Sequence, residues 1–364
     1  MSASMTQEST LISTEPKQFH FMPAEWEMHD ATLLAWPHNR FTWPDHHLGD
    51  VEQVYLNLIR ELTVTDRVLL LCGKKKSSLY LHVEHTLREN GLNLDKIELV
   101  DYPTNDVWAR DFGPIVVRSL FDNSAIYLDW SFNSWGGKYP PFDLDDRIPS
   151  KLASRYDVAV RSLDFVLEGG SIDVNGTGTL LTTESVLLNP NRNPAYSKKE
   201  IEEILSTELG IKQVIWLSSG LEGDDTDGHI DDLARFVNEN TIFCCLNEDS
   251  LDPNYETLQE NYRRLLDAKN LDGQSFHVIP IPMPDTRTDE KTVDGSDRLP
   301  ASYANFYFSN GRILLPLYDA DTDEQAISLF KKHVKGFEIV GIPCRDLVWG
   351  QGSIHCITQQ IYGL

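Results

Sequence analysis

Residues 171–217, SIDVNGTGTLLTTESVLLNPNRNPAYSKKEIEEILSTELGIKQVIWL, contain every element of one folding unit. The runs 171–174 and 179–183 have the composition of two short strands. Ser197 followed by Glu200 predicts a capping box at the start of a helix, and Gly210 predicts where that helix ends. The run 214–217 predicts a third strand. This stretch therefore predicts the order strand, strand, helix, strand.

The same order recurs along the rest of the chain. Three further units comprise 108–117, 125–130, 148–156 and 158–165; 229–237, 241–246, a helix from 253 and 277–282; and 303–308, 312–317, 323–335 and 337–342. A fifth unit is divided between the ends: 354–359 supplies its first strand, and 31–36, a helix from 51 and 68–72 supply the rest. Each unit leaves an apolar face uncovered, so the units should stack around an axis, and the divided unit should close the ring. We expect an α/β fold with one domain over 19–364, preceded by a polar, disordered tail at 1–18.

The composition limits the classes of function. The 364 residues include 56 Asp and Glu against 32 Lys and Arg, which gives a formal net charge of −24. Such a charge disfavours a nucleic-acid partner and attracts cations. The N-terminus lacks the pattern of a secretory signal, and no apolar run is long enough to span a bilayer, so we expect a cytoplasmic protein without a membrane partner. The five cysteines show no paired spacing for zinc or redox chemistry.

The segment Gly350-Gln351-Gly352-Ser353-Ile354-His355-Cys356 ends in the candidate nucleophile. Glycines before a thiol, Gly352 among them, let the backbone approach a ligand closely. Cys356 carries the one type of side chain that is partly a thiolate nucleophile near neutral pH. If the segment is a strand, His355 points to the opposite face, so His355 is not the expected base.

The segment Asp225-Thr226-Asp227-Gly228-His229-Ile230-Asp231 offers an imidazole among carboxylates. On a strand, His229 and Asp231 point to one face, where His229 could act as acid and base and Asp231 could bind a cation. A calcium loop does not fit, because with Gly228 at its sixth position the first position is a glycine. A transition-metal site made from His229, Asp225, Asp227 and Asp231 is the alternative.

Two more segments bring carboxylates to the start of their units. In Trp108-Ala109-Arg110-Asp111, Asp111 could accept two parallel N–H bonds from a planar cation, with Trp108 alongside it. Alternatively, Trp108 belongs to the core and Arg110 forms a structural ion pair with an aspartate. Glu168, before Gly169-Gly170, could orient the catalytic imidazole, or the paired glycines could form an ordinary turn. In a closed ring, Asp111, Glu168, His229 and Cys356 would meet at the centre.

These motifs together resemble the agmatine deiminase and Porphyromonas-type peptidylarginine deiminase family, one of the guanidino-group-modifying enzymes. The matching stretches are MPAEWE (22–27), AWPH (35–38), WARDFGP (108–114), LEGGSIDVNGTGTLLTTESVLLNPNRNP (167–194), DTDGHIDD (225–232), NFYFSNG (305–311) and IHCITQQ (354–360). The resemblance implies a five-bladed α/β propeller with pseudo-fivefold symmetry. It also implies hydrolysis of a guanidinium to a ureido group and ammonia, with no metal or organic cofactor.

Carried onto this chain, the resemblance makes Cys356 the nucleophile, His229 the acid and base, Asp111 and Asp231 the guanidinium clamp, and Glu168 the acid that holds the histidine. The candidate substrate-binding residues are Trp108, Asp225 and Gly352. Agmatine is the leading substrate, giving N-carbamoylputrescine for putrescine synthesis through a covalent thiouronium.

Several alternatives stay open. Peptidyl or free arginine, giving citrulline, would need a partner for the α-carboxylate, and Arg110 and Arg235 are the arginines considered for it. A metal-dependent guanidine hydrolase and a non-catalytic binder of cations are the others. Dimers are common among such enzymes, so the resemblance allows a homodimer.

Overall fold

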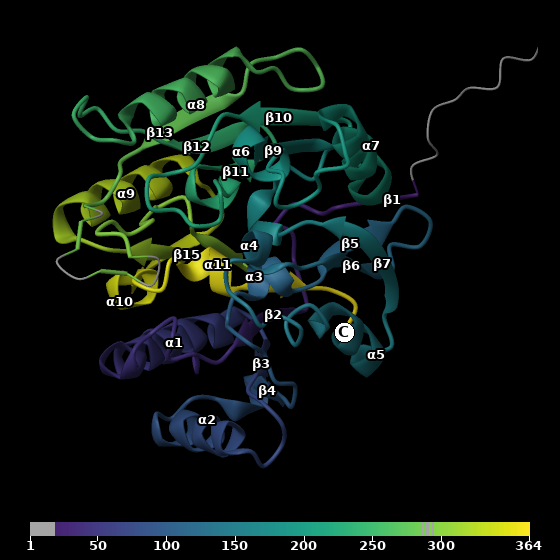
Figure 1. Cartoon of the computed structure of the whole chain (residues 1–364), viewed down its shortest axis with the longest axis vertical. Coiled ribbons are helices and arrows are strands. Elements are labelled where there is room, and N and C mark those ends of the chain that lie inside the picture. Colours follow the sequence, from purple (N-terminus) through teal and green to yellow (C-terminus); the bar gives the residue numbers. More distant parts are fainter. Residues whose placement is uncertain (1–18, 286, 289–290, 293–294) are drawn as a thin grey trace, which may run out of the picture.

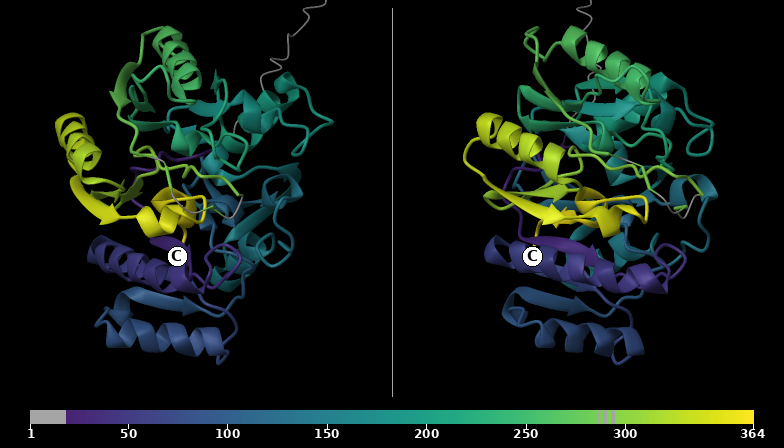
Figure 2. Two further views of the ribbon diagram at one scale, coloured as in Figure 1. Left: turned by 60° about the vertical axis from the view of Figure 1, so that its left-hand side comes forward. Right: turned by 90° about the vertical axis from the view of Figure 1, so that its left-hand side faces the viewer.

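A computed structural model describes residues 19–285, 287–288, 291–292 and 295–364. The predicted disordered tail, residues 1–18, lies outside these residues. The described part of the chain forms a mixed α/β structure of five small sheets with helices around them. The long helices lie on the outside of the molecule (Figures 1 and 2).

The sheets follow the predicted units. Their strand orders are β1(His20–Phe21)-β5(Ile115–Ser119)-β6(Ala125–Ser131)-β7(Ala159–Val166), β10(Gln213–Leu217)-β9(Thr179–Thr183)-β8(Asp173–Val174), β11(Ala234–Asn238)-β12(Thr241–Cys245)-β13(His277–Ile281), β14(Tyr307–Ser309)-β15(Arg312–Leu317)-β16(Glu338–Pro343) and β17(Gln359–Ile361)-β2(Ala31–Ala35)-β3(Val68–Leu71)-β4(Ile97–Val100). In each unit the first two strands pair antiparallel, and a helix leads to a third strand that pairs parallel. The fifth sheet joins the two ends of the chain, because β17 pairs with β2 (Figure 1).

The longer helices all cross between strands that pair parallel. They are α1 (Asp45–Thr65), α2 (Ser78–Glu89), α5 (Ile148–Tyr156), α7 (Lys198–Leu209), α8 (Tyr255–Asp267) and α9 (Ala320–His333). The predicted capping box of α7 is present, and Gly210 ends that helix in the left-handed conformation at φ 72°. A capping box satisfies backbone N–H groups that would otherwise lack partners. The local sequence therefore defines both ends of this helix.

Three predicted helix starts are wrong, and one of them belongs to the helix expected at 323–335, which begins at Ala320. The helix expected from 51 begins at Asp45, and the helix expected from 253 begins at Tyr255, after Asn254 at its N-cap. The unit shared by the chain ends also contains α2 and β4, which the repeat did not predict. Helix ends and added elements depend on packing between units, which the local pattern does not contain.

The prediction that the site residues lie on strands is also wrong in three places. Short helical turns precede the strands: α3 (Ala109–Phe112) before β5, a 3-10 turn (Ile230–Asp232) before β11, and α11 (Ile354–Ile357) before β17. Local backbone bonds close these turns, including Gly113 N–H to Ala109 O at 2.9 Å and Leu233 N–H to Ile230 O at 2.9 Å. Asp111, Asp231 and Cys356 therefore lie on tight turns at the strand entrances.

The other short turns are α4 (Ser134–Gly137), α6 (Glu184–Leu187) and α10 (Arg345–Val348), with 3-10 turns at Leu94–Lys96 and Gly169–Ser171. The helices α3, α4 and α11 lie close together near the middle of the molecule (Figure 1). Contacts join α11 to α3, and α3 to the turn at Gly169–Ser171. The turns that carry the candidate site residues therefore meet, although they are far apart in the sequence.

Candidate active site

The turns bring a thiol, an imidazole and two carboxylates together. His229 Nδ1 lies 3.7 Å from Asp111 Oδ1 and 3.9 Å from Asp231 Oδ1. Cys356 Sγ lies 3.8 Å from Asp231 Oδ2. All four side chains are buried. Residues separated by more than 200 positions in the sequence thus form one cluster.

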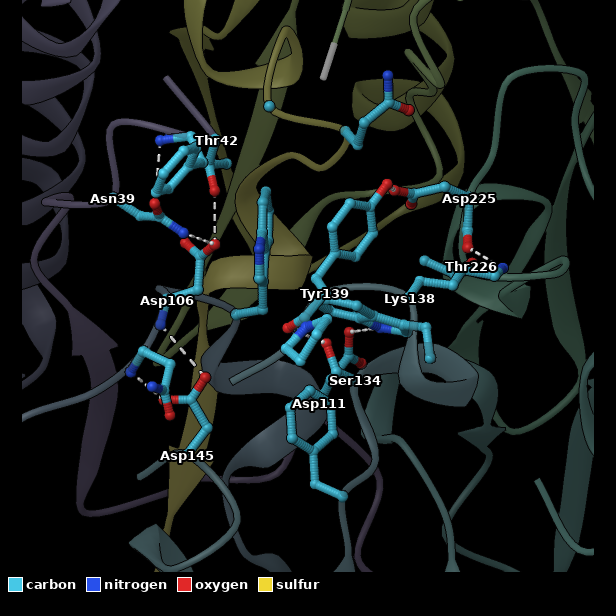
Figure 3. Close-up of a pocket in the computed structure, with 18 of the residues that line it drawn as sticks. Asn39, Thr42, Asp106, Asp111, Ser134, Lys138, Tyr139, Asp145, Asp225 and Thr226 are labelled. Carbon is cyan, nitrogen blue, oxygen red and sulfur yellow. Dashed lines mark hydrogen bonds between the residues drawn. The ribbon is translucent and has the colours of Figure 1, made fainter. Parts of the chain in front are cut away.

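A pocket of about 520 Å³ reaches this cluster. Its lining includes Cys356, Asp111, Trp108 and Asp225. Figure 3 shows Asp225 and Thr226 on one side of the pocket and Asp106 and Asp145 on the other, with Tyr139 and Asp111 between them. A small molecule that enters this pocket meets the thiol.

Two glycines permit the close packing of the cluster. A Cβ atom on Gly170 would lie 2.6 Å from His229 Nδ1, 2.9 Å from Asp111 Oδ1 and 3.0 Å from Asp231 Oδ2. A Cβ atom on Gly352 would collide with the Trp108 ring and lie 3.1 Å from Cys356 Cβ. Glycine at position 352 therefore lets the Trp108 indole pack closely against the backbone, and the predicted approach to a ligand stays a prediction.

Trp135 is a residue of the site that the sequence analysis missed. Its Nε1–H donates to Asp111 Oδ2 at 3.0 Å, while Gly170 N–H donates to Asp111 Oδ1 at 3.0 Å. Trp135 has φ 54° and ψ 43°, a left-handed conformation that is uncommon for a bulky side chain. The sequence feature that could have pointed to Trp135 is the Gly136-Gly137 pair that follows it. The two donors together fix the orientation of the Asp111 carboxylate.

Burial and neighbouring charges shift the acid–base groups of the site. Burial, with Asp231 and Glu168 nearby, raises the pKa of Asp111 to about 6. Burial lowers the pKa of His229, but the carboxylates of Asp111, Asp231 and Glu168 outweigh it and raise that pKa above its ordinary value. The pKa of the Cys356 thiol is raised well above its ordinary value by burial and by the nearby carboxylates. These surroundings therefore favour the protonated imidazole and the neutral thiol.

Glu168 lies beside His229, but its hydrogen bond is made to another residue. Its Oε1 accepts from Arg192 Nε at 2.6 Å, and Arg192 also bonds Asp227 at 2.6 Å. Within the described part of the chain, Glu168 Oε2 and His229 Nε2 are buried atoms with no hydrogen-bond partner. The two groups are therefore coupled by charge in this structure, and the hydrogen bond expected between them is not formed.

His355 lies inside the cluster, and its predicted orientation away from the site is wrong. Its Nδ1 lies 2.7 Å from Asp231 Oδ2, and its Nε2 lies 2.7 Å from Glu25 Oε2. The alternation argument failed because α11 is helical at this point. His355 thus connects Asp231 to a second buried carboxylate.

Arg110 and Arg235 are structural. Both are buried and lie close to Glu25 Oε2, Arg235 at 2.9 Å and Arg110 at 3.4 Å. Arg235 also pairs with Asp173 at 2.7 Å. The alternative interpretation of Arg110 as an ion-pair residue is correct, although its partner is a glutamate. Neither arginine lines the pocket among the described residues.

The alternative metal set is not assembled. Asp225 accepts from Tyr139 Oη at 2.5 Å, and Asp227 pairs with Lys138 at 2.8 Å and with Arg192. Among the described residues, the group whose ligand atoms lie within 4.8 Å of one another is Asp231, Asp232 and Cys356, which contains the thiol itself. The four residues considered for a metal therefore have different partners.

Comparison with known proteins agrees with this geometry. Residues 21–361 match the model of the family described as Porphyromonas-type peptidyl-arginine deiminase. The chain belongs to this family. The deiminases of this family are hydrolases that act on C–N bonds, and this chain is an enzyme of that class. The structure contains no helix, within the residues it describes, with the length and apolar character needed to cross a membrane.

Individual members of the family are similar over nearly the whole deiminase chain. A protein of Legionella pneumophila (strain Paris) named "Putative agmatine deiminase" is 37% identical, with 96% of this chain and 97% of that protein aligned. The agmatine deiminase of Enterococcus faecalis is 30% identical with a TM-score of 0.86, covering 98% of this chain and 100% of its own. A C. jejuni agmatine deiminase with substrate bound is 33% identical with a TM-score of 0.83, covering 95% and 96%.

Proposed function

We propose that this protein is an agmatine deiminase that converts agmatine and water to N-carbamoylputrescine and ammonia, a step toward putrescine. The observation that carries the proposal is a thiol lining an acidic pocket beside an imidazole and two carboxylates. A guanidinium is flat and positively charged, and its N–H groups can donate hydrogen bonds to two carboxylates. Asp111 and Asp231 can therefore bind it from two sides. Trp108, Asp225 and Gly352 contribute to the binding of the substrate.

The reaction proceeds through a covalent intermediate on Cys356. When the guanidinium is bound, the Cys356 thiol loses its proton to solvent, and the thiolate attacks the guanidinium carbon and forms a C–S bond, which gives a tetrahedral adduct. His229 donates a proton to the departing nitrogen, and the C–N bond breaks. Ammonia is released, and an S-alkylthiouronium remains on Cys356. The neutral imidazole then takes a proton from water, which attacks the same carbon. The C–S bond breaks, and the ureido product and the thiol are released.

Substrate binding brings positive charge next to the Cys356 thiol. Burial, together with the carboxylates of Asp231, Asp232 and Asp111, raises the pKa of the Cys356 thiol. A bound guanidinium neutralises part of this negative charge, so it favours loss of the thiol proton just when the electrophile is in place. The carboxylate of Glu168 helps to raise the pKa of His229, so it favours the protonated imidazole that donates to the leaving group.

The pocket favours an amine tail over an amino acid. An amino acid would need a cation in the pocket to bind its carboxylate. Among the described residues that line the pocket, the cationic side chain is Lys138, and its Nζ already donates to Asp225 O at 2.5 Å and to Asp227 Oδ1 at 2.8 Å. The carboxylates of Asp106, Asp145 and Asp225 also line the pocket and attract a second cation. The agmatine deiminases similar to this chain support the same choice. Peptidyl or free arginine is the second candidate, because the family model carries that description.

Product analysis tests the proposal. Agmatine, free arginine and a blocked arginine peptide are offered separately to wild type, Cys356→Ser and the control Cys72→Ser, which changes a buried thiol at the end of β3. We expect ureido product from agmatine with wild type and the control, and none with Cys356→Ser. Product from the peptide instead would move the assignment to the second candidate, and activity in Cys356→Ser would refute the mechanism.

The five sheets support one further part of the proposal, that residues 19–364 form a single propeller-like domain closed by the β17–β2 pair. Limited proteolysis followed by cooperative unfolding measurements tests it, because one domain should unfold in a single transition. Two separated transitions would contradict it.

A further inference from the structure

His355 lies between two carboxylates from different parts of the chain. Its Nδ1 lies 2.7 Å from Asp231 Oδ2, and its Nε2 lies 2.7 Å from Glu25 Oε2. All three side chains are buried. Both ring nitrogens therefore make short contacts with carboxylate oxygens in a part of the protein that is closed to solvent.

These two contacts identify the protonation state of the ring. A neutral imidazole carries one N–H and one lone pair, whereas an ionised carboxylate can only accept. A lone pair that points at a carboxylate oxygen 2.7 Å away is repelled, so each ring nitrogen carries a hydrogen when both carboxylates are ionised. The ring is then an imidazolium that donates one hydrogen bond to each carboxylate.

Glu25 has the partners of an ionised carboxylate. Its Oε2 lies 2.9 Å from Arg235 Nη2 and 3.4 Å from Arg110 Nη2, and its Oε1 accepts from Phe308 N–H at 2.9 Å. Burial raises its pKa, but Arg235, His355 and Arg110 outweigh burial and lower that pKa well below its ordinary value. Glu25 is therefore a fixed negative charge at the Nε2 end of the ring.

Asp231 uses one oxygen for His355 and keeps the other one free. Its Oδ2 accepts from His355, while its Oδ1 is a buried atom without a hydrogen-bond partner among the described residues. Burial raises the pKa of Asp231, but its cationic neighbours, His355 first among them, outweigh burial and lower that pKa below its ordinary value. The contact with His355 thus favours an ionised Asp231 whose Oδ1 can accept from a guanidinium N–H.

The other charges around the ring explain why this contact matters. Among the described residues these charged groups are Asp231 and Glu25 at the ring nitrogens, Arg110 and Arg235 beside Glu25, and Asp111, Asp232 and His229 beside Asp231. The two carboxylates beside Asp231 disfavour its ionised form, and the imidazolium in contact with it favours that form.

We propose that His355 is a positioning residue, whose imidazolium keeps Asp231 ionised and directs Asp231 Oδ1 to the guanidinium, while Glu25 holds the imidazolium in place. This inference rests on the proposed function, in which Asp231 binds a guanidinium. His355 itself touches no substrate and transfers no proton in the reaction.

His355→Gln is the variant that tests this role. A glutamine side chain has the NH₂ group to donate to one carboxylate, but it presents an acceptor oxygen to the other one. His29→Gln is the matched control, because His29 is also buried and its Nε2 lies 3.0 Å from Asp66 Oδ2, a carboxylate that does not line the pocket. Circular dichroism first establishes that both variants are folded.

The pH dependence of kcat/KM separates this role from a structural one. At pH about 7, kcat/KM for agmatine should fall about 10- to 100-fold in His355→Gln, mainly through a higher KM, as expected for a lost hydrogen bond between charged groups. Because the pKa of Asp231 rises when the imidazolium is lost, the acid limb should move upward by about one pH unit or more. The difference from wild type should therefore shrink as the pH increases.

The control should keep the wild-type pH profile. A folded His355→Gln variant with wild-type kcat/KM, or with the same loss at every pH, would overturn the inference.

Nitrogen NMR of the wild-type protein tests the charge on the ring without any variant. The two ring nitrogens of His355, assigned by through-bond correlation from its backbone amide, should both give the chemical shifts of protonated nitrogens at pH about 7. A nitrogen with a lone pair in this ring would overturn the inference.

The two proposals can fail separately. If Cys356→Ser is active, or if wild type forms no ureido product, the proposed function fails, whatever the NMR spectrum of His355 shows. If product forms as expected and His355→Gln keeps the wild-type pH profile, the proposed function stands and only the role of His355 fails.

Discussion

Gly170→Ala tests the packing of the candidate active site with the smallest change the chain allows. Gly170 lies in the 3-10 turn Gly169–Ser171, and its φ is outside the left-handed region, so alanine fits the backbone itself. The new methyl group would lie 2.6 Å from His229 Nδ1. Ordinary contact begins at 3.4 Å, so the imidazole must retreat by about 0.8 Å unless the backbone moves.

This displacement gives the expected magnitude. A misplacement of about 1 Å in a catalytic group lowers the rate on the order of 100-fold, and overpacking destabilises a folded protein by about 1–3 kcal/mol. We therefore expect kcat/KM for agmatine to fall about 30- to 100-fold in Gly170→Ala. Ammonia release measured by a coupled assay gives the activity, and urea unfolding gives the stability.

Gly49→Ala is the control for this substitution. Gly49 lies in α1, and a Cβ atom there meets nothing within 4 Å. Alanine should leave activity unchanged and stabilise the helix by up to about 1 kcal/mol. Wild-type kcat/KM in Gly170→Ala, with normal folding, would refute the argument that Gly170 sets the spacing of His229, Asp111 and Asp231.

Four shorter predictions follow from the same site. Because Asp111 must be ionised to bind a guanidinium and its pKa is raised to about 6, kcat/KM should fall as the pH drops below about 6; a flat profile down to pH about 5 would contradict this. Trp135→Phe removes the donor to Asp111 Oδ2 and should raise KM about 5- to 10-fold, measured by steady-state kinetics, whereas an unchanged KM would show that Gly170 N–H is sufficient. Gly352→Ala collides with Trp108 and should lower both activity and melting temperature, and wild-type values for both would count against that collision. Incubation with excess EDTA, followed by the ammonia assay, should leave activity unchanged, while complete loss would favour the metal-dependent alternative.

Much of the fold was readable because its signals are local. The capping box at Ser197 and Glu200, the stop at Gly210 and the strand at 179–183 all depend on neighbouring residues, and the structure has them as predicted. The pairing of the two chain ends was also predicted, because the divided unit lacked a first strand. The order strand, strand, helix, strand recurs in each unit, so the prediction for one unit supported the predictions for the others.

Contacts at the site were harder to predict. His355 was assigned to the wrong face because a strand was assumed where α11 is helical. Neighbouring side chains point to opposite faces on a strand, but they do not on a helical turn. The hydrogen-bond partner of Glu168 is Arg192, and Trp135 was missed altogether. Each of these contacts joins residues from different elements, and no local pattern encodes which elements meet.

The sequence by itself determined the repeated order of elements, the acidic character and the membership of a deiminase family. The order and the acidic character follow from spacing and composition within the chain, and the deiminase class follows from the resemblance of its motifs to a known family. Only the tertiary structure decided that the candidate catalytic groups lie on turns, that Gly170 leaves room for them, and that Arg110 and Arg235 are buried away from the pocket. The physical reason is that distances of 3–4 Å between side chains are set by the packing of separate elements against one another, and each element's own sequence specifies only its local conformation.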